Sequence, residues 1–265
     1  MQFENNPKKS LGQNFLIDKN IINKIIKIGN INKNKTVVEI GPGYGNLTEA
    51  IISMYPKKML VIEKDKKLCL LLTKKFQNIK VINEDILDVI KNKSLTNNSL
   101  VFGNLPYNIS TQILAHLITL KKWPPWYEHL IFMFQKEVAD RIIAETNTKN
   151  YGRLSIISNW KMKIEKIIDI EPRSFSPSPK VKSTLLVFVP KKQYHIIKDP
   201  KNLEHITNIF FSQRRKMIKK PLKFLFNNFE EVSKKLSIDL KLRPQNLDHK
   251  TYYKICELYE LDLIK

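Results

Sequence analysis

The chain has 265 residues, 42% of them hydrophobic, which is long enough for a core domain with a smaller companion and excludes wholesale disorder. Lys and Arg outnumber Asp and Glu by 46 to 25, and the formal net charge of +21 predicts a polyanionic partner such as nucleic acid, unless the basic surface merely reflects composition. The two cysteines are isolated, so we expect no disulfide and no metal site. The chain has no apolar run of the ~18 residues that a membrane span needs, and its start lacks the apolar core of a signal peptide, which predicts a cytoplasmic protein without membrane contact. We also expect a monomer.

The first 190 residues have the pattern of a sheet layered with helices. A basic segment and a helix with an isoleucine face occupy residues 1–35, and short apolar runs then alternate with longer amphipathic stretches. Strands are expected at 36–40, 59–63, 80–85, 99–104 and 129–134, and helices near 46–54, 66–76, 110–120 and 136–145. A further pair of strands, at about 160–170 and 184–190, could close the sheet as an antiparallel edge. This order predicts an α/β domain over 1–190 whose mostly parallel sheet has helices on both faces.

The pattern changes to helix alone after residue 190. Helices are expected at 202–220, 230–238 and 248–261, interrupted at Pro221 and Pro244. We therefore expect residues 191–265 to form a small all-α domain.

The first expected strand runs into the glycine-rich turn Gly41-Pro42-Gly43-Tyr44-Gly45. Such a turn lets a ligand approach the backbone closely at the carboxyl end of a strand, where open α/β sheets bind ligands. A dinucleotide fingerprint would place its third glycine at position 46, which is Asn46. The spacing is more typical of class I methyltransferases than of dehydrogenases, although a plain structural turn is the simpler alternative.

The next two expected strands end in acids. Glu63 follows Gly41 by about 20 residues, the spacing at which an acid accepts hydrogen bonds from two ribose hydroxyls. Asp85 could accept a hydrogen bond from the amino group of a cofactor's adenine. The alternatives are a solvated acid among lysines for Glu63, and a helix N-cap or turn carboxylate for Asp85.

The fourth expected strand ends in Asn104-Leu105-Pro106-Tyr107. An adenine N6 amine is a poor nucleophile because its lone pair is delocalised into the ring. Acceptors on the Asn104 side chain and the Leu105 carbonyl would favour a tetrahedral nitrogen, Pro106 would stiffen the turn, and Tyr107 would offer a ring for stacking. Positioning and electrostatics would then carry methyl transfer from a sulfonium without a strong general base.

Five segments together resemble the ribosomal RNA adenine dimethylases over nearly the whole chain. They are KKSLGQNFL at 8–16, EIGPGYGNLT at 39–48, VFGNLPYNIS at 101–110, FQKEVADRI at 134–142 and FSPSPKVKS at 175–183. The resemblance implies a class I Rossmann-like methyltransferase fold with a seven-stranded sheet, and S-adenosylmethionine as cofactor.

The resemblance also implies roles for particular residues. The implied cofactor-binding set is Asn14, Leu16, Gly41, Gly43, Glu63, Asp85 and Asn104. Asn104 would contact the target amine as well, within a catalytic set of Asn104, Leu105, Pro106, Tyr107 and Phe175. Tyr107 and Phe175 would sandwich an adenine drawn out of its stack. Core packing is the alternative for Phe175.

Two branches of the family differ in substrate. One dimethylates two adjacent adenosines in a hairpin loop near the 3′ end of 16S rRNA, in the small ribosomal subunit or its precursor, and the other acts on 23S rRNA in macrolide resistance. Leu105, the QKEVADR segment and the long helical tail favour the 16S branch. Phosphate contacts would come from Lys8, Lys9, Arg214, Arg215 and Lys216, for which a disordered end or a solvated helix face is the alternative. The rival hypotheses are a dehydrogenase and a non-catalytic RNA-binding protein.

Overall fold

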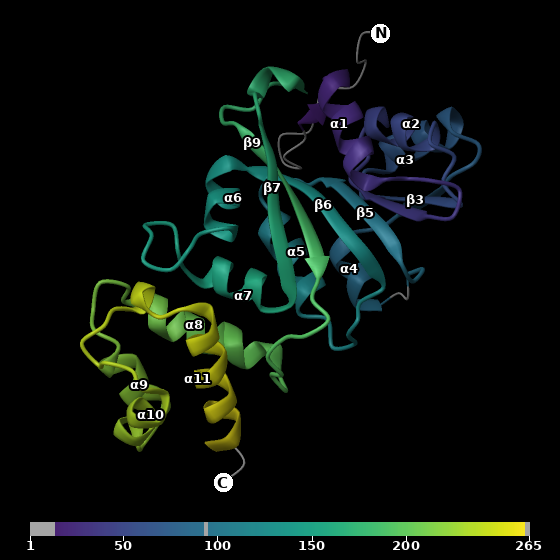
Figure 1. Cartoon of the computed structure of the whole chain (residues 1–265). Coiled ribbons are helices and arrows are strands. Elements are labelled where there is room, and N and C mark those ends of the chain that lie inside the picture. Colours follow the sequence, from purple (N-terminus) through teal and green to yellow (C-terminus); the bar gives the residue numbers. More distant parts are fainter. Residues whose placement is uncertain (1–13, 93–94, 263–265) are drawn as a thin grey trace. The chain divides into compact units, whose positions relative to one another are not determined.

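The computed structural model describes residues 14–92 and 95–262, which divide into two compact units. Unit 1 comprises Met1–Ala139 and Ile164–Pro190, and unit 2 comprises Asp140–Lys163 and Lys191–Lys265. The chain therefore passes from unit 1 to unit 2 and back before leaving again after Pro190 (Figure 1). The expected boundary at residue 190 thus assigned residues 140–163 to the wrong unit. They group with unit 2 because buried side chains such as Trp160 pack in its core.

A seven-stranded sheet is the centre of unit 1, as the sequence predicts. In space its strands follow the order β4-β3-β2-β5-β6-β9-β7. The neighbouring pairs from β4 to β6 are parallel, and β9 is antiparallel to β6. The strands are β2 (Thr36–Ile40), β3 (Lys58–Glu63), β4 (Lys80–Asn83), β5 (Ser99–Asn104), β6 (Tyr127–Gln135), β7 (Met162–Ile170) and β9 (Ser183–Pro190). The carboxyl ends of the five parallel strands therefore lie at one edge of the sheet.

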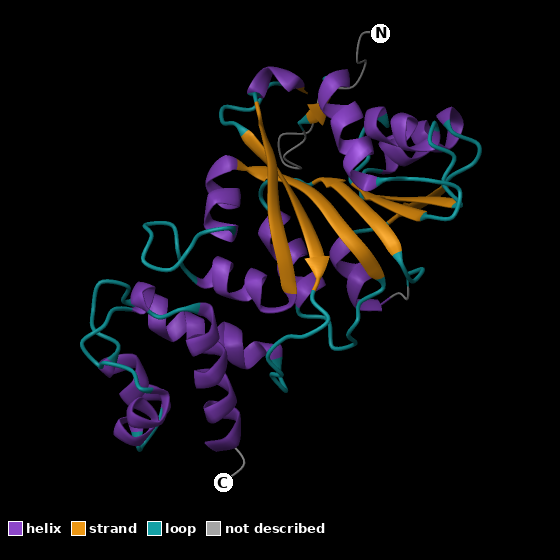
Figure 2. Ribbon diagram, in the orientation of Figure 1, coloured by secondary structure: helices purple, strands orange, loops and turns teal. Residues whose placement is uncertain are grey.

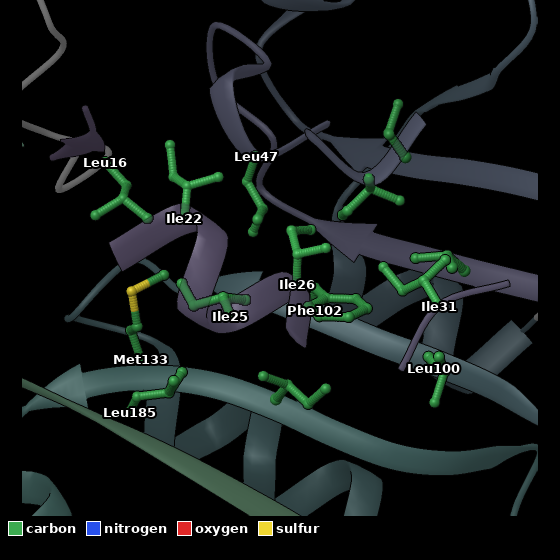
Figure 3. Packing of buried hydrophobic residues seen from close by; sticks show 14 of the residues in the cluster. Leu16, Ile22, Ile25, Ile26, Ile31, Leu47, Leu100, Phe102, Met133 and Leu185 are labelled. Carbon is green, nitrogen blue, oxygen red and sulfur yellow. The ribbon is translucent and has the colours of Figure 1, made fainter. Parts of the chain in front are cut away.

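Helices cover both faces of this sheet (Figure 1). One face carries α1 (Lys19–Gly29), α2 (Asn46–Ile52) and α3 (Lys66–Lys75), and the other carries α4 (Ile86–Asn92) and α5 (Ser110–Ile118). The isoleucines of α1, which recur at helical spacing, point at the sheet, where Ile25 and Ile26 lie beside Phe102 (Figure 3). The predicted isoleucine face is thus the face that α1 buries.

A second, very short sheet fastens the beginning of the described chain. Strand β1 (Phe15–Leu16) pairs antiparallel with β8 (Phe175–Ser176). Asp18 follows β1 and caps α1 by accepting hydrogen bonds from the backbone of Asn20 and Ile21. Its other oxygen accepts a hydrogen bond from Ser174 at 3.0 Å, in the 3-10 helix η2 (Pro172–Ser174). The segment before α1 is therefore held against residues far along the chain.

Unit 2 is helical (Figure 2). Besides α6 (Lys136–Ile142), which leads into it, it holds α7 (Arg153–Lys161), α8 (Pro200–Ser212), α9 (Lys219–Leu225), α10 (Phe229–Leu236), the 3-10 helix η3 (Pro244–Asn246) and α11 (His249–Asp262). The helix expected over 202–220 is wrong at its end, because α8 stops at Ser212 and a turn leads to α9. Pro221 does not interrupt a helix. It lies in the first turn of α9, where a missing N–H leaves no hydrogen bond unmade.

Candidate active site

Nine residues singled out in the sequence line a single cleft at the carboxyl edge of the sheet. They are Asn14, Gly41, Gly43, Glu63, Asp85, Asn104, Leu105, Pro106 and Tyr107. They come from the segment before α1 and from the ends of β2, β3, β4 and β5. Residues distant in the chain are thus brought together where an open α/β sheet binds ligands.

The glycine turn after β2 forms one wall of this cleft. Gly41 and Gly43 have φ angles of +68° and +58°, in the left-handed region that side chains disfavour. A Cβ on Gly43 would lie 2.5 Å from the ring of Phe15, so this position has no room for a side chain. The Gly43 N–H points at Glu63 and donates to its Oε2 at 3.3 Å. No role was predicted for Phe15, whose ring closes over the turn.

The Glu63 carboxylate at the end of β3 is buried and held by backbone donors. Besides the Gly43 N–H, the Asp65 N–H donates to its Oε1 at 2.9 Å. Burial raises the pKa of Glu63 above its ordinary value. The side chain is therefore fixed within the wall of the cleft, and the alternative of a solvated acid is wrong.

Asp85 has two hydrogen-bonding partners. Its Oδ1 accepts from the Leu87 N–H at 2.9 Å at the start of α4, the cap that the sequence left open as an alternative. Its Oδ2 pairs with the Lys64 ammonium at 2.9 Å. Burial raises the pKa of Asp85, but the hydrogen bonds from Leu87 and Lys64 hold it below its usual range. Asp85 therefore caps the start of α4 and lines the cleft at the same time.

Asn104 ends β5 with its side-chain amide oriented. The Nδ2 donates to the main-chain carbonyl of Asn14 at 2.5 Å, which only an N–H can do. This contact leaves Oδ1 as the acceptor of the side chain. Leu105, the next residue, is buried with its side chain over Gly103, where a Cβ would lie 2.6 Å from it. The backbone at Asn104 and Leu105 is thus fixed by packing as well as by the sheet.

Tyr107 is half-buried and fastened through its hydroxyl. Its OH lies 2.6 Å from the Ser183 Oγ at the start of β9. The loop that carries it turns at Pro106, whose carbonyl accepts from the Ile109 N–H at 3.1 Å. Burial raises the pKa of Tyr107, so it remains a neutral phenol. The ring of Tyr107 lines the cleft beside Asn104.

Leu16 and Phe175 lie outside the main cleft. Leu16 lines a smaller neighbouring pocket that also includes Gly41 and Asn104, and its carbonyl accepts from the Asn46 side chain at 2.8 Å. Phe175 pairs with Leu16 between β8 and β1 and is only 2% exposed within the hydrophobic core. The structure does not bring Phe175 to the cleft, and core packing, the alternative from the sequence, describes its place.

The expected phosphate-contacting residues lie apart in the chain. Lys8 and Lys9 are outside the described residues. Arg215 and Lys216 are exposed in the turn between α8 and α9, where Arg214 donates to the Thr148 carbonyl at 3.1 Å. The alternative of a solvated helix face fails in one respect, because the turn is not helical.

Two features are absent from residues 14–92 and 95–262, the part of the chain that the structure describes. These residues contain no group of three or more His, Cys, Asp or Glu side chains placed to hold a metal ion. They also contain no helix with the length and apolar character needed to cross a membrane.

Comparison with known proteins gives concordant results. A ribosomal RNA small subunit methyltransferase A from Pelagibacter ubique is 56% identical over 254 residues, 96% of this chain and 97% of the relative. The enzyme of the same name from Buchnera aphidicola is 41% identical over 252 residues, 92% of this chain and 93% of the relative. A crystal structure of a dimethyladenosine transferase from Plasmodium falciparum superposes with a TM-score of 0.77 at 25% identity, covering 93% of this chain and 98% of the other. The family model for ribosomal RNA adenine dimethylase matches residues 4–261. The chain belongs to the ribosomal RNA adenine dimethylase family.

Proposed function

We propose that the protein dimethylates N6 of two adjacent adenosines in a hairpin loop near the 3′ end of 16S rRNA, with S-adenosylmethionine as methyl donor, during assembly of the small ribosomal subunit. The observation that carries the chemistry is the hydrogen bond from the Asn104 Nδ2 to the Asn14 carbonyl, which leaves Oδ1 of this cleft residue as the acceptor. The small-subunit names of the relatives favour 16S rRNA over 23S rRNA.

The residues of the cleft fit S-adenosylmethionine. When bound, this cofactor supplies an electrophilic methyl group on a sulfonium. Gly41 and Gly43 let a ligand approach the backbone, and Glu63 has a carboxylate fixed to accept ribose hydroxyls. Asp85, at the next strand end, would accept a hydrogen bond from the adenine amino group. For this its Oδ2 must separate from the Lys64 ammonium, whose side chain is 63% exposed. Leu16 would act from the neighbouring pocket.

The chain's own residues then prepare the target amine. The Asn104 Oδ1 and the Leu105 carbonyl accept the two N6 hydrogens, which favours a tetrahedral nitrogen with an available lone pair. Tyr107 stacks on the adenine and Pro106 keeps the turn stiff. After transfer the amine's surplus proton leaves to solvent, so no strong base is required. Tyr107 is the one aromatic ring of the proposed pair that lines the cleft, since Phe175 would have to leave the core to join it.

The RNA partner matches the charge of the protein. With a net charge of +21 the molecule attracts the phosphate backbone, and Arg214, Arg215 and Lys216 are the proposed contacts in unit 2. We propose that the protein is cytoplasmic. We also propose that it acts as a monomer, which is supported by a cleft whose nine named residues all belong to one chain.

The test offers purified protein and labelled S-adenosylmethionine to small subunits that lack the modification, with 23S rRNA as the comparison substrate. We expect label in two adjacent adenosines of 16S rRNA, and label on 23S rRNA alone would contradict the substrate.

The variant Asn104→Ala should abolish methyl transfer while RNA binding survives, because it removes the acceptor from the amine but no phosphate contact. Asn78→Ala, which removes an exposed amide in the turn before β4, is the matched control. Methyl transfer by Asn104→Ala at the wild-type rate would rule out the amine-gripping mechanism. RNA binding without transfer by the unaltered protein would favour a non-catalytic role.

A further inference from the structure

Tyr107 is fastened at both ends, which the stacking role alone does not require. The Ser110 Oγ donates to the Tyr107 carbonyl at 3.2 Å and fixes its backbone. The hydroxyl at the far end of the ring lies 2.6 Å from the Ser183 Oγ. Because the hydroxyl oxygen lies on the axis that runs from Cβ through the ring, these two contacts fix the position and direction of that axis.

Ser183 is placed at the cleft's edge by the direction of its strand. Strand β9 runs antiparallel to β6, so its first residue lies at the edge where the parallel strands end. The register pairs Asn104 with Met133 and, two residues further along β6, Gln135 with Ser183. The side chain of Ser183 is fully buried and does not line the cleft. It therefore lies behind the ring of Tyr107 rather than beside the substrate.

We propose that Ser183 is a positioning residue that holds the axis of the Tyr107 ring in place for stacking on the target adenine. The inference rests on the proposed function and adds a residue to it. The ring must lie over the base to stack on it, and a base drawn out of its stack has lost the neighbouring bases that it stacked on. A hydroxyl fixed in a strand of the central sheet holds the ring axis in place before the base arrives, so the ordering cost is met during folding.

A purely structural role for Ser183 makes a different prediction. The neighbouring Thr184 is also fully buried and its hydroxyl donates to Asp169 at 2.7 Å. Each hydroxyl makes one hydrogen bond from the same strand, but only the partner of Ser183, Tyr107, lines the cleft. Thr184→Val is therefore the matched control for Ser183→Ala.

The experiment measures methyl transfer to unmodified small subunits by Ser183→Ala, Tyr107→Phe and the double variant. Each single variant should lower kcat two- to tenfold, the effect of one net hydrogen bond, with the KM for the subunit unchanged. The double variant should be no slower than the slower single variant, because both changes remove the same contact. Ser183→Thr, which keeps a hydroxyl, should restore kcat, and Thr184→Val should leave it unchanged.

A second readout follows the base itself. In an RNA hairpin with 2-aminopurine at the target adenosine, stacking on Tyr107 quenches the fluorescence, and Ser183→Ala and Tyr107→Phe should reduce this quenching equally. Wild-type kcat in Ser183→Ala or in Tyr107→Phe would overturn the inference, and so would losses that multiply in the double variant. These results are distinguishable from failure of the proposed function, in which the unaltered protein transfers no methyl group to small-subunit adenosines. Should Ser183→Ala fail to fold, Tyr107→Phe alone carries the test.

Discussion

Glu39 and Glu63 are two buried acids on neighbouring strands, and the charge of Glu63 opposes ionisation of Glu39. Glu39 lies on β2 and is 2% exposed, with its Oε2 accepting from the Thr48 hydroxyl at 2.6 Å. Burial, and to a smaller degree the charge of Glu63, raises the pKa of Glu39 to about 8, although the hydrogen bond from Thr48 favours the ionised form. At neutral pH the structure therefore holds Glu39 protonated beside the glycine turn.

This proton makes stability depend on pH. Between the ordinary pKa of 4.5 and about 8, the folded chain retains a proton at Glu39 that the unfolded chain has lost. The free energy of unfolding therefore falls as pH rises through this window, by at most about 1.4 kcal/mol per pH unit from this group. Glu39→Gln, which is neutral at every pH, should melt at a higher temperature than the wild type near pH 8 and lose that advantage near pH 4.5. Glu49→Gln, at an exposed acid of α2, is the control. Parallel melting curves for Glu39→Gln and the wild type across the window would contradict the prediction.

At Gly43 we expect the absence of a side chain to matter for ligand binding. Alanine there would adopt a φ of +58°, which costs about 1–2 kcal/mol, and its Cβ would displace the ring of Phe15 from the turn. We expect Gly43→Ala to weaken S-adenosylhomocysteine binding roughly tenfold, measured by titration calorimetry. Gly152→Ala is the control, since Gly152 has an extended φ of 178° and its Cβ would lie 3.8 Å from the Phe211 ring. Unchanged affinity in Gly43→Ala would mean that the turn does not contact the ligand.

The elements of unit 1 were predictable because their apolar periodicity decides them. The expected strands at 36–40 and 99–104 coincide with β2 and β5. In unit 2 periodicity fails at Gln213, where residues 202–220 look like one helix. The chain turns there because the backbone of Ile218 donates to Leu242 at 2.8 Å, a distant contact that no local pattern contains. Likewise β1 and β8, with two residues each, are too short to have a pattern.

A buried carboxylate from α11 binds the segment at the start of α8. The Glu260 carboxylate is 6% exposed and accepts from the backbone of Lys198 and Asp199 and from the Asn202 side chain. Glu260→Ala would leave these donors without a partner, and hydrogen bonds to a charged group each contribute about 1.5–3 kcal/mol. We expect a loss of at least about 2 kcal/mol in the free energy of unfolding of unit 2 and faster hydrogen exchange at the start of α8. Glu257→Ala, at a half-exposed acid of the same helix, should change little. Equal losses in the two variants would show that Glu260 does not stabilise the start of α8 through these hydrogen bonds.

At the scale of the molecule, the sequence could place the site but not complete it. Nine of the predicted residues meet in one cleft because strand order and the glycine turn are local signals, and parallel strands share a carboxyl edge. Phe15, Lys64 and Ser183 were not singled out, because their contacts cross the chain, 76 residues in the case of Ser183. The segment 175–183 that contains Ser183 was recognised, so a signal for it existed.

The excess positive charge gives a prediction for the whole molecule. RNA affinity should fall linearly with salt on logarithmic axes, by about 0.7–0.9 for each phosphate contact. Replacing the exposed Arg215 and Lys216 with glutamine should lower this slope by one to two contacts, measured by filter binding at several salt concentrations. Lys234 and Lys235, exposed at the end of α10, carry the same charge and are the matched control pair. Equal slopes for the two double variants would show that Arg215 and Lys216 act only through net charge.

The antiparallel strand β9 also determines when the enzyme can first work. During synthesis from the N-terminus, the glycine turn after β2 and Asn104 are made before Ser183. Between Asn104 and Ser183 the chain also includes residues 140–163, which belong to the other unit. A nascent chain that ends before β9 therefore lacks both the strand that continues the sheet beyond β6 and the hydroxyl that fastens Tyr107. The central sheet cannot be obtained by cutting the chain at residue 139, and the protein becomes competent only when synthesis has passed Pro190.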